Sequence, residues 1–323
     1  MGRVLRLLNI LILSCGLAFA GETPDSPKPS SPPVIQKLGT LDCDLVETTP
    51  VVFRDRLYRF EYIRENYAAN QTGKSYFHFV DVESGQTTPP FAAGFHLGCA
   101  FVDRDTMYVY GVETWGAGKI QVFWSTDFNH WQTAVALDLP GWQIFNQSVC
   151  AASGRFVMAF EIGAPPDETG VAFTTRFAES TDLIHWQLTP SSCVYTRERY
   201  SACPSLRFLD GLFYMTYLES RPGPTYETHL VRSSDLQHWE SSRFNPILKF
   251  SDDDKKISNP RLTDSQRARI EKAVDINNSD VDFCEFQGKV ILYYSWGNQQ
   301  GVEHLAEAVY PGTLKNFLQG YFP

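Results

Sequence analysis

One pattern occurs five times along this chain: a short apolar strand, a tight turn, and then an aromatic-rich strand. The first residues after the five turns are Leu57, Met107, Phe156, Phe213 and Val290. Successive repeats are therefore separated by 50, 49, 57 and 77 residues. Because apolar residues alternate on both arms of each turn, the pattern predicts five β-hairpins. Repetition at such a period is typical of folds built from one recurring unit.

A second motif lies between the hairpins, at residues 125–131, 180–186 and 233–239. Each copy begins with Ser, continues with Ser or Thr and then Asp, and ends in His-Trp. Ser and Asp side chains can bond the backbone of their own turn, and we expect each Trp to pack between neighbouring units. We interpret the three histidines as part of this scaffold. Hairpin and motif together predict an all-β fold, a five-bladed β-propeller with four-stranded antiparallel blades.

The beginning of the chain differs from the repeats in composition. Residues 1–20 combine two arginines, an apolar run and small residues before Gly21, which predicts a secretory signal peptide. Residues 21–40 begin with a stretch rich in Pro and Ser and predict a flexible linker, and residues 41–323 are assigned to the propeller. We therefore expect a secreted or periplasmic protein. Lipoprotein anchoring through Cys15 is less favoured, because residues 12–15 are a poor version of that cleavage motif.

Composition narrows the classes of partner. The formal net charge is −9 and no Lys/Arg cluster occurs, which argues against nucleic acid. The later segments are not apolar enough for a stable membrane helix, and we expect a monomer. The cysteines after Cys15 are widely spaced, which favours buried free thiols over disulfides and argues against zinc. No cofactor is expected, although an axial structural cation such as calcium is compatible with the fold.

Two short segments lie in the long interval before the fifth hairpin. Thr263 and Gln266 have the spacing of a capping box and predict a short helix after residue 263. Residues 252–256 are acidic and then basic, but they lack the glycine and the alternation of a calcium loop. We expect that run to be a solvated loop.

With these repeats, residues 42–323 resemble the five-bladed propeller glycosidases, namely glycoside hydrolase family 43 and the related families 32, 62 and 117. The resemblance implies a base Asp in an Asp-Pro pair that begins the first blade, an Asp that modulates pKa in the third, and an acid Glu in the fourth. Here the corresponding positions hold Thr49-Pro50, Asn146 and the segment 201–204. Glu47 lies two residues before Thr49. The chain therefore diverges in the catalytic trio.

Propeller geometry predicts where catalytic residues gather, because first strands begin and second strands end around one funnel. Four second strands end in Glu61, Glu113, Glu161 and Glu219, and before the first strands lie Glu47, His96, Asn146, Tyr200 and Asp280. Glycoside hydrolysis needs one protonated and one ionised carboxyl group, and crowding of carboxylates raises the pKa of at least one. We expect Glu47 as the base and Glu219 as the proton donor, with Asp280 as a further catalytic candidate.

A larger set is expected to bind substrate: Glu61, Arg64, His96, Glu113, Asn146, Glu161, Arg199, Tyr200, Trp296, Gln299 and His304. The arginines suit an acidic sugar or neutralise the glutamates, and Trp115, Trp142 and Trp296 are candidate stacking platforms. The sequence thus favours a secreted glycosidase that acts on polysaccharide-derived oligosaccharides. Two alternatives stay open: a glycan-binding propeller without catalysis, and a lyase that uses His96 or Tyr200 on a uronic acid.

Overall fold

The five predicted hairpins are all present in the computed structural model, which describes residues 31–65 and 74–323. They are β2 (Thr49–Phe53) with β3 (Arg56–Ile63), β5 (His96–Asp103) with β6 (Thr106–Val112), β9 (Gln143–Ala152) with β10 (Arg155–Ala164), β13 (Ala202–Leu209) with β14 (Leu212–Arg221), and β17 (Asn277–Phe286) with β18 (Lys289–Gly297). Four of the five turns place both central residues at positive φ, as in Arg54-Asp55 and Asp210-Gly211. That conformation is the type I′ turn, whose twist matches that of the flanking strands.

Each hairpin continues outward into a small antiparallel sheet. The third strands are β4 (Tyr76–Asp81), β7 (Lys119–Ser125), β11 (Thr174–Ser180), β15 (Thr225–Ser233) and β19 (Glu303–Tyr310). The fourth strands are β8 (Gln132–Asp138), β12 (Gln187–Leu188), β16 (Trp239–Ser241) and β1 (Gln36–Cys43). The fourth and fifth groups join into one eight-stranded sheet through a single parallel pair, Tyr226 with Asn277. The fold is thus mainly β and built largely from four-stranded units, as predicted.

The first and last sheets differ from the predicted pattern. The first contains three strands, and isolated bridges from Thr87 and Phe91 to β4 stand in place of a fourth. In the last sheet the fourth strand is β1, while the end of the chain forms helix α3 (Leu314–Gly320). The predicted linker at residues 21–40 is therefore too long, because residues 36–40 belong to β1. Pairing with β19 orders this segment although its own composition is not strand-like.

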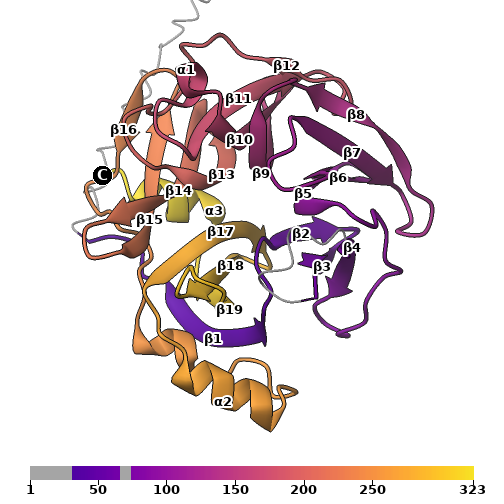
Figure 1. Cartoon of the computed structure of the whole chain (residues 1–323). Coiled ribbons are helices and arrows are strands. Elements are labelled where there is room, and N and C mark those ends of the chain that lie inside the picture. The colour runs from indigo at the N-terminus through magenta and orange to yellow at the C-terminus, as the bar shows by residue number, and fades with distance from the viewer. Residues whose placement is uncertain (1–30, 66–73) are drawn as a thin grey trace, which may run out of the picture.

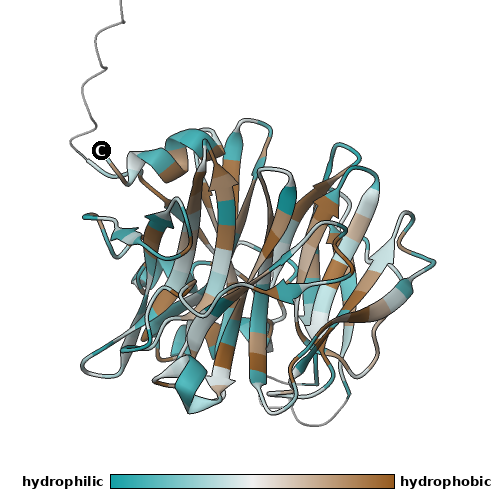
Figure 2. Ribbon diagram, turned by 90° about the horizontal axis from the view of Figure 1, so that it is seen from above, coloured by the Kyte–Doolittle hydropathy of each residue, from teal (hydrophilic) through white to brown (hydrophobic). Residues whose placement is uncertain are grey.

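The first strands β2, β5, β9, β13 and β17 contact one another in a closed ring. Figure 1 shows the sheets around a central axis with these strands innermost. In the perpendicular view of Figure 2 the strands cross the thickness of the molecule, and hydrophilic loops lie at both ends. The loops at one end of the ring therefore share one face.

The predicted Trp packing between units is confirmed. Trp131 stacks on Phe91 beside the first sheet at 3.7 Å between ring centroids, and Trp186 meets Tyr110 of the second sheet at 5.7 Å. Trp239 stacks on Phe177 of the third sheet at 5.7 Å. In each copy the Asp side chain accepts hydrogen bonds from its own turn, and the histidine is largely exposed. The motif is therefore scaffold.

Helices occupy little of the fold: α1 (Pro166–Thr169), the 3₁₀ turn η2 (Asp252–Lys255), α2 (Asp264–Lys272) and α3. The capping box that begins α2 is present, because Thr263 Oγ1 accepts from the Gln266 N–H and the Gln266 side chain accepts from the Thr263 N–H. Within residues 31–65 and 74–323, no helix is long and apolar enough to cross a membrane. The cysteines of that region are free thiols, as expected.

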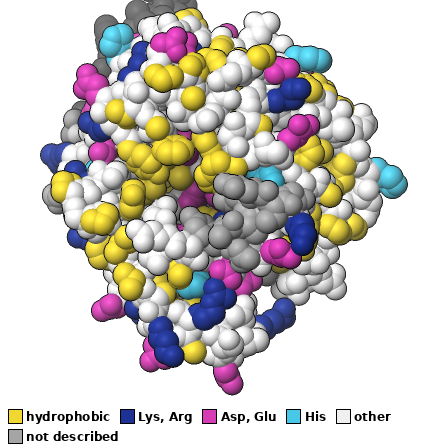
Figure 3. Space-filling view, viewed as in Figure 1, with side chains coloured by type: hydrophobic (Ala, Val, Ile, Leu, Met, Phe, Trp, Pro, Cys, Tyr) yellow, Lys and Arg dark blue, Asp and Glu magenta, His cyan; other side chains and the backbone are white. Residues whose placement is uncertain are grey.

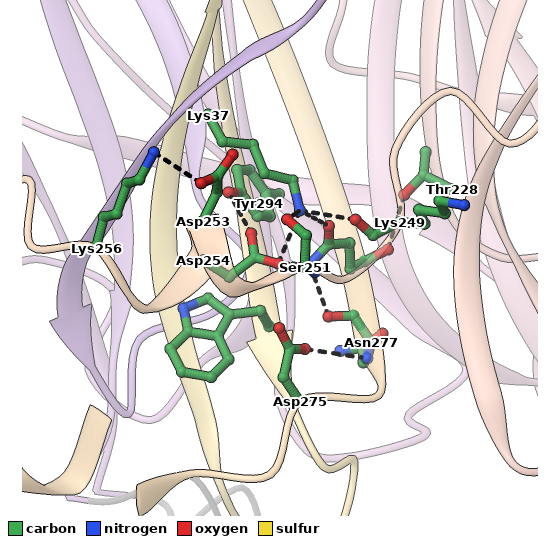
Figure 4. Close-up of polar contacts among 12 residues, drawn as sticks. Lys37, Thr228, Lys249, Ser251, Asp253, Asp254, Lys256, Asp275, Asn277 and Tyr294 are labelled. Atoms are coloured by element: carbon green, nitrogen blue, oxygen red, sulfur yellow. Dashed lines mark hydrogen bonds and ion pairs between the residues drawn. The ribbon is translucent and has the colours of Figure 1, made fainter. Parts of the chain in front are cut away.

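The expectation that residues 252–256 form a solvated loop is wrong, because Asp254 is fully buried. Lys37 of β1 donates hydrogen bonds of 2.7 Å to Asp254 Oδ2, to Asn278 Oδ1 and to the Lys249 carbonyl (Figure 4). The Tyr294 hydroxyl donates to Asp254 Oδ1 at 2.6 Å. This buried cluster fastens the N-terminal strand to the last sheet, so the acidic run has a structural role.

Candidate active site

Five structurally equivalent residues surround the axis at the start of the first strands. Each lies ten residues before the residue that follows its hairpin turn, and they are Glu47, Leu97, Asn146, Cys203 and Asp280. Glu47, Asn146, Cys203 and Asp280 line one pocket together with neighbouring residues of all five first strands. Figure 3 shows acidic side chains in the hollow at the centre of this face, with hydrophobic side chains along part of its border. Of the acidic residues predicted to converge here, Glu47 and Asp280 line this pocket.

The backbone at these positions is irregular. Glu47, Leu97, Cys203 and Asp280 have φ between 50° and 54°, a left-handed conformation that non-glycine residues rarely adopt. The register shifts beside Leu97, Asn146, Cys203 and Asp280, where an extra residue is inserted into the strand. Bulges of this kind re-aim side chains and are common beside active sites.

Glu161 is the second-strand glutamate that reaches this cluster. Its Oε2 accepts hydrogen bonds from the Cys203 N–H at 2.8 Å and from Asn146 Nδ2 at 3.2 Å. Counted from the first residue after each hairpin turn, Glu161 lies five residues along its strand, after Phe156. Glu61 lies four residues after Leu57, and Glu113 and Glu219 lie six residues after Met107 and Phe213. Because side chains alternate along a strand, an odd offset places Glu161 on the opposite face from the other three.

The environments of Glu47 and Glu161 favour their protonated forms. Burial, with a smaller contribution from the charge of Asp280, raises the pKa of each carboxyl group to about 7. Arg64 opposes this effect at Glu47, because its guanidinium lies 3.3 Å from Glu47 Oε2. The donors at Glu161 are a backbone N–H and a side-chain amide, both neutral. The two carboxyl groups therefore differ in the partner that stabilises their charge.

Asp280 is surrounded by hydroxyl groups. The Ser279 and Ser295 hydroxyls lie 2.6 Å and 2.7 Å from Asp280 Oδ2, and both can donate to it. A fourth acid, Glu303, is buried close by, and burial raises its pKa to about 8. Glu303 accepts from the Gln299 N–H at 2.7 Å and from Asn277 Nδ2 at 3.1 Å. The sequence analysis selected the neighbouring residues Gln299 and His304 but not Glu303.

The other three second-strand glutamates lie elsewhere. Glu219, expected as proton donor, accepts from the Tyr217 hydroxyl at 2.9 Å and lies 3.4 Å from Arg199 Nε, on the face toward the third sheet. Glu61 binds Arg59 and His78 at the contact between the first and last sheets, where it lines a separate pocket. Glu113 is exposed. None of the three lines the central pocket, so the substrate-binding and catalytic roles expected of them there are not supported.

Several other predicted residues are buried in the scaffold. His96 is 1% exposed and its Nδ1 bonds the Tyr62 hydroxyl at 2.6 Å, so it is inaccessible as a base. Trp296 is fully buried and donates to Thr40 Oγ1 at 2.9 Å, so it cannot stack on a ligand. His304 packs against Trp296 and is also fully buried. His96 faces the first sheet, whereas Trp296 and His304 pack within the last sheet, so none of the three lines the central pocket.

Arg64, Tyr200 and Gln299 lie near the cluster, as predicted. Arg64 pairs with Glu47, and Gln299 Nε2 lies 3.4 Å from the Ser279 hydroxyl. Burial, together with Cys203, Glu161 and Asp280, raises the pKa of Tyr200 well above its usual value, so its phenol stays neutral. Within the described residues, no group of three or more His, Cys, Asp or Glu side chains is arranged to hold a metal ion.

No family model and no curated protein matches this chain. Solved structures match it over most of their length. One glycoside hydrolase has a TM-score of 0.59 at 12% identity, with 85% of this chain and 92% of that chain covered. An α-L-arabinofuranosidase from Podospora anserina in complex with cellotriose has a TM-score of 0.57 at 10% identity, with 86% and 97% covered.

A thermostable family-43 glycoside hydrolase is similar to the same extent, with a TM-score of 0.55 at 10% identity and coverage of 85% and 92%. Identity this low shows a shared fold. The chain has the fold of these family 43- and family 62-type glycoside hydrolases, with a sequence far diverged from theirs.

Proposed function

We propose that this protein is a secreted, five-bladed β-propeller glycoside hydrolase that acts on polysaccharide-derived oligosaccharides by carboxylate catalysis in the central pocket. The closed ring of five first strands supports the blade count. The shared fold with glycoside hydrolases supports the enzyme class. The observation that carries the proposal is the presence of Glu47 and Asp280 in one pocket, with Glu161 hydrogen-bonded to the pocket-lining residues Asn146 and Cys203 and with unequal environments at Glu47 and Glu161.

We assign a role to each carboxyl group from its environment. When the coupled pair of Glu47 and Glu161 has lost one proton, Glu47 holds the negative charge, because Arg64 lies beside it. The remaining proton stays on Glu161, where burial and the charge of Asp280 retain it. Glu161 is then the general acid that protonates the leaving oxygen, and Glu47 is the ionised partner. Glu161 replaces Glu219 as the proton donor.

This assignment is tested with leaving groups of different acidity. Glu161→Gln should lose hydrolysis of alkyl glycosides and unmodified oligosaccharides, but keep much of its activity on glycosyl fluorides, whose leaving group needs no proton. Glu47→Gln should lose activity on both substrate classes. Glu113→Gln is the matched control, since its side chain is exposed outside the pocket. Equal losses of Glu161→Gln on both substrate classes would contradict the assignment.

A second function is favoured by one observation: Asn146 and Cys203 occupy two of the five equivalent positions, where the family resemblance implies carboxylates. A glycan-binding protein without catalysis is the corresponding hypothesis. It predicts calorimetric binding of an oligosaccharide that stays intact on long incubation with the wild-type protein. A screen of aryl glycosides and defined oligosaccharides distinguishes the two functions. The lyase hypothesis loses support, because His96 is buried and Tyr200 stays protonated.

A further inference from the structure

A second cleft lies between the first and last sheets, outside the central pocket. These sheets are neighbours in the ring, where β2 contacts β17 and β18 (Figure 1). The cleft has a volume of about 600 Å³, within the range of about 300–1,000 Å³ that small-molecule sites occupy. Its walls are β3 and β4 on one side and β1, β18 and β19 on the other, and residues 258–261 border it. We call it the lateral cleft.

Strand register brings polar side chains of the last sheet to this cleft. Asp42 of β1 pairs with Leu305 of β19, and Glu307 of β19 pairs with Tyr293 of β18. Because alternate residues of a strand share a face, Leu305 and Glu307 point the same way. Leu305 belongs to one apolar cluster with Leu57 of the first sheet. Asp42, Tyr293 and Glu307 therefore face the first sheet, and all three line the cleft.

The cation on the first-sheet wall is already paired. Arg59 Nε donates to Glu61 Oε1 at 2.7 Å, and His78 Nε2 lies 2.7 Å from Glu61 Oε2. Arg261 and Glu83 are exposed. Together the lining carries four carboxyl groups and two guanidinium groups: Asp42, Glu61, Glu83, Glu307, Arg59 and Arg261. Negative charge therefore exceeds positive charge in the lateral cleft.

Asp42 and Glu307 are the carboxyl groups whose charge is least compensated. Asp42 Oδ1 accepts from Gln266 Nε2 at 3.0 Å and from a backbone N–H at 2.7 Å, and both donors are neutral. Burial raises the pKa of Asp42 and of Glu307, although Arg59 acts against the rise at both and Lys289 acts against it at Glu307. A further cation in the cleft would stabilise both carboxylates.

A buried hydroxyl group also points to a ligand in the cleft. Tyr293 is fully buried, and within the described part of the chain its hydroxyl has no hydrogen-bond partner of acceptable geometry. The Arg59 guanidinium lies over the Tyr293 ring, 5.3 Å from its centroid. A buried polar group without a partner costs free energy. Because Tyr293 lines the cleft, a bound molecule can supply the missing hydrogen bond.

From these observations we infer that the lateral cleft binds an amino sugar whose amine is free. Its ammonium group lies against Asp42 and Glu307, where charge-assisted hydrogen bonds are available. One of its hydroxyls bonds the Tyr293 hydroxyl, which is why the ligand carries hydroxyl groups as well as a charge. The lateral cleft is separate from the central pocket, so this binding site does not depend on the proposed function.

The test compares three sugars that share one ring: D-glucosamine, N-acetyl-D-glucosamine and D-glucose. Each is titrated calorimetrically into the wild-type protein at pH 6.5 and low ionic strength. We expect one glucosamine molecule to bind per chain. The two neutral sugars should bind at least about tenfold more weakly, since neither brings a charged donor. Equal binding of the three sugars, or no binding of glucosamine, overturns the inference.

Two variants locate the amine in the lateral cleft. Glu307→Gln should weaken glucosamine binding about tenfold, whereas Glu113→Gln removes the same charge from an exposed position and should bind like the wild-type protein. Tyr293→Phe keeps the ring beside Arg59 and should weaken binding about threefold. It should not lower the melting temperature, because the hydroxyl that it removes has no partner in the protein. Equal binding by Glu307→Gln and the wild-type protein contradicts the inference.

A third variant is needed because the central pocket also contains carboxyl groups. Glu47→Gln, which alters that pocket, should bind glucosamine like the wild-type protein. Binding that is lost in Glu47→Gln and kept in Glu307→Gln would assign the amine to the central pocket and overturn the inference. Hydrolysis of aryl glycosides, which Glu307→Gln should retain, reports separately on the proposed function, so each can fail without the other.

Discussion

Replacement of the proposed acid should stabilise the fold in a way that depends on pH. In the folded protein Glu161 is 4% exposed, and burial raises its pKa from 4.5 to about 7. The folded state therefore holds a proton that the unfolded chain releases between these two values. Stability falls as pH rises through that window, and above pH 7 the cost of the ionised, buried carboxylate is complete.

The magnitude follows from the pKa difference. A rise of the pKa from 4.5 to about 7 lowers the free energy of unfolding by about 3 kcal/mol at pH 8 and by about 1 kcal/mol at pH 5. Glu161→Gln removes this cost, and the Gln carbonyl can still accept from the Cys203 N–H that now bonds Oε2. We expect the variant to exceed the native protein in stability by about 3 kcal/mol at pH 8.

Urea unfolding followed by tryptophan fluorescence at pH 5 and pH 8 measures both differences. Glu113→Gln serves as the control and should show the same small difference at both pH values, because its side chain is exposed. The reasoning is refuted if Glu161→Gln is no more stable than the native protein at pH 8, or if its advantage is equal at the two pH values. Greater stability together with lost hydrolysis is the trade-off expected of an active-site residue.

Three other predictions follow from the structure. The pH dependence of kcat/KM should be bell-shaped around pH 7, with an acid limb from protonation of Glu47 and an alkaline limb from deprotonation of Glu161. With glycosyl fluorides, whose leaving group needs no proton, the alkaline limb should be lost. Lys37→Met should lower the free energy of unfolding by about 3–5 kcal/mol, because it leaves the buried Asp254 carboxylate without its cation. Lys315→Met, which breaks the exposed pair with Asp210, is the control and should lower it by under about 1 kcal/mol. Glu219→Gln should keep most of kcat/KM on every substrate, since Glu219 lies outside the pocket, and a loss as large as that of Glu161→Gln would contradict this.

The sequence alone determined the repeating architecture. Alternation of apolar residues predicts strands, and the short turns between them permit only hairpins. All five pairs of hairpin strands could therefore be located from the sequence. The Trp packing was likewise predictable, since the Trp motif recurs with the repeating unit. The capping box at Thr263 was predictable because it depends on two residues only three positions apart. Three of the five positions around the axis, Glu47, Asn146 and Asp280, were also located from the sequence, whereas His96 and Tyr200 were named where the structure has Leu97 and Cys203.

Only the tertiary structure decided which acidic residues share the pocket. Glu161 and Glu219 look equivalent in the sequence, yet their offsets differ by one residue, and one residue reverses the direction of a strand side chain. Bulges at the first strands add a further shift that the apolar pattern does not reveal. The pairing of β1 with β19 and the burial of Asp254 by Lys37 join residues more than 200 positions apart. Such contacts depend on closure of the whole ring, which no local pattern of residues records.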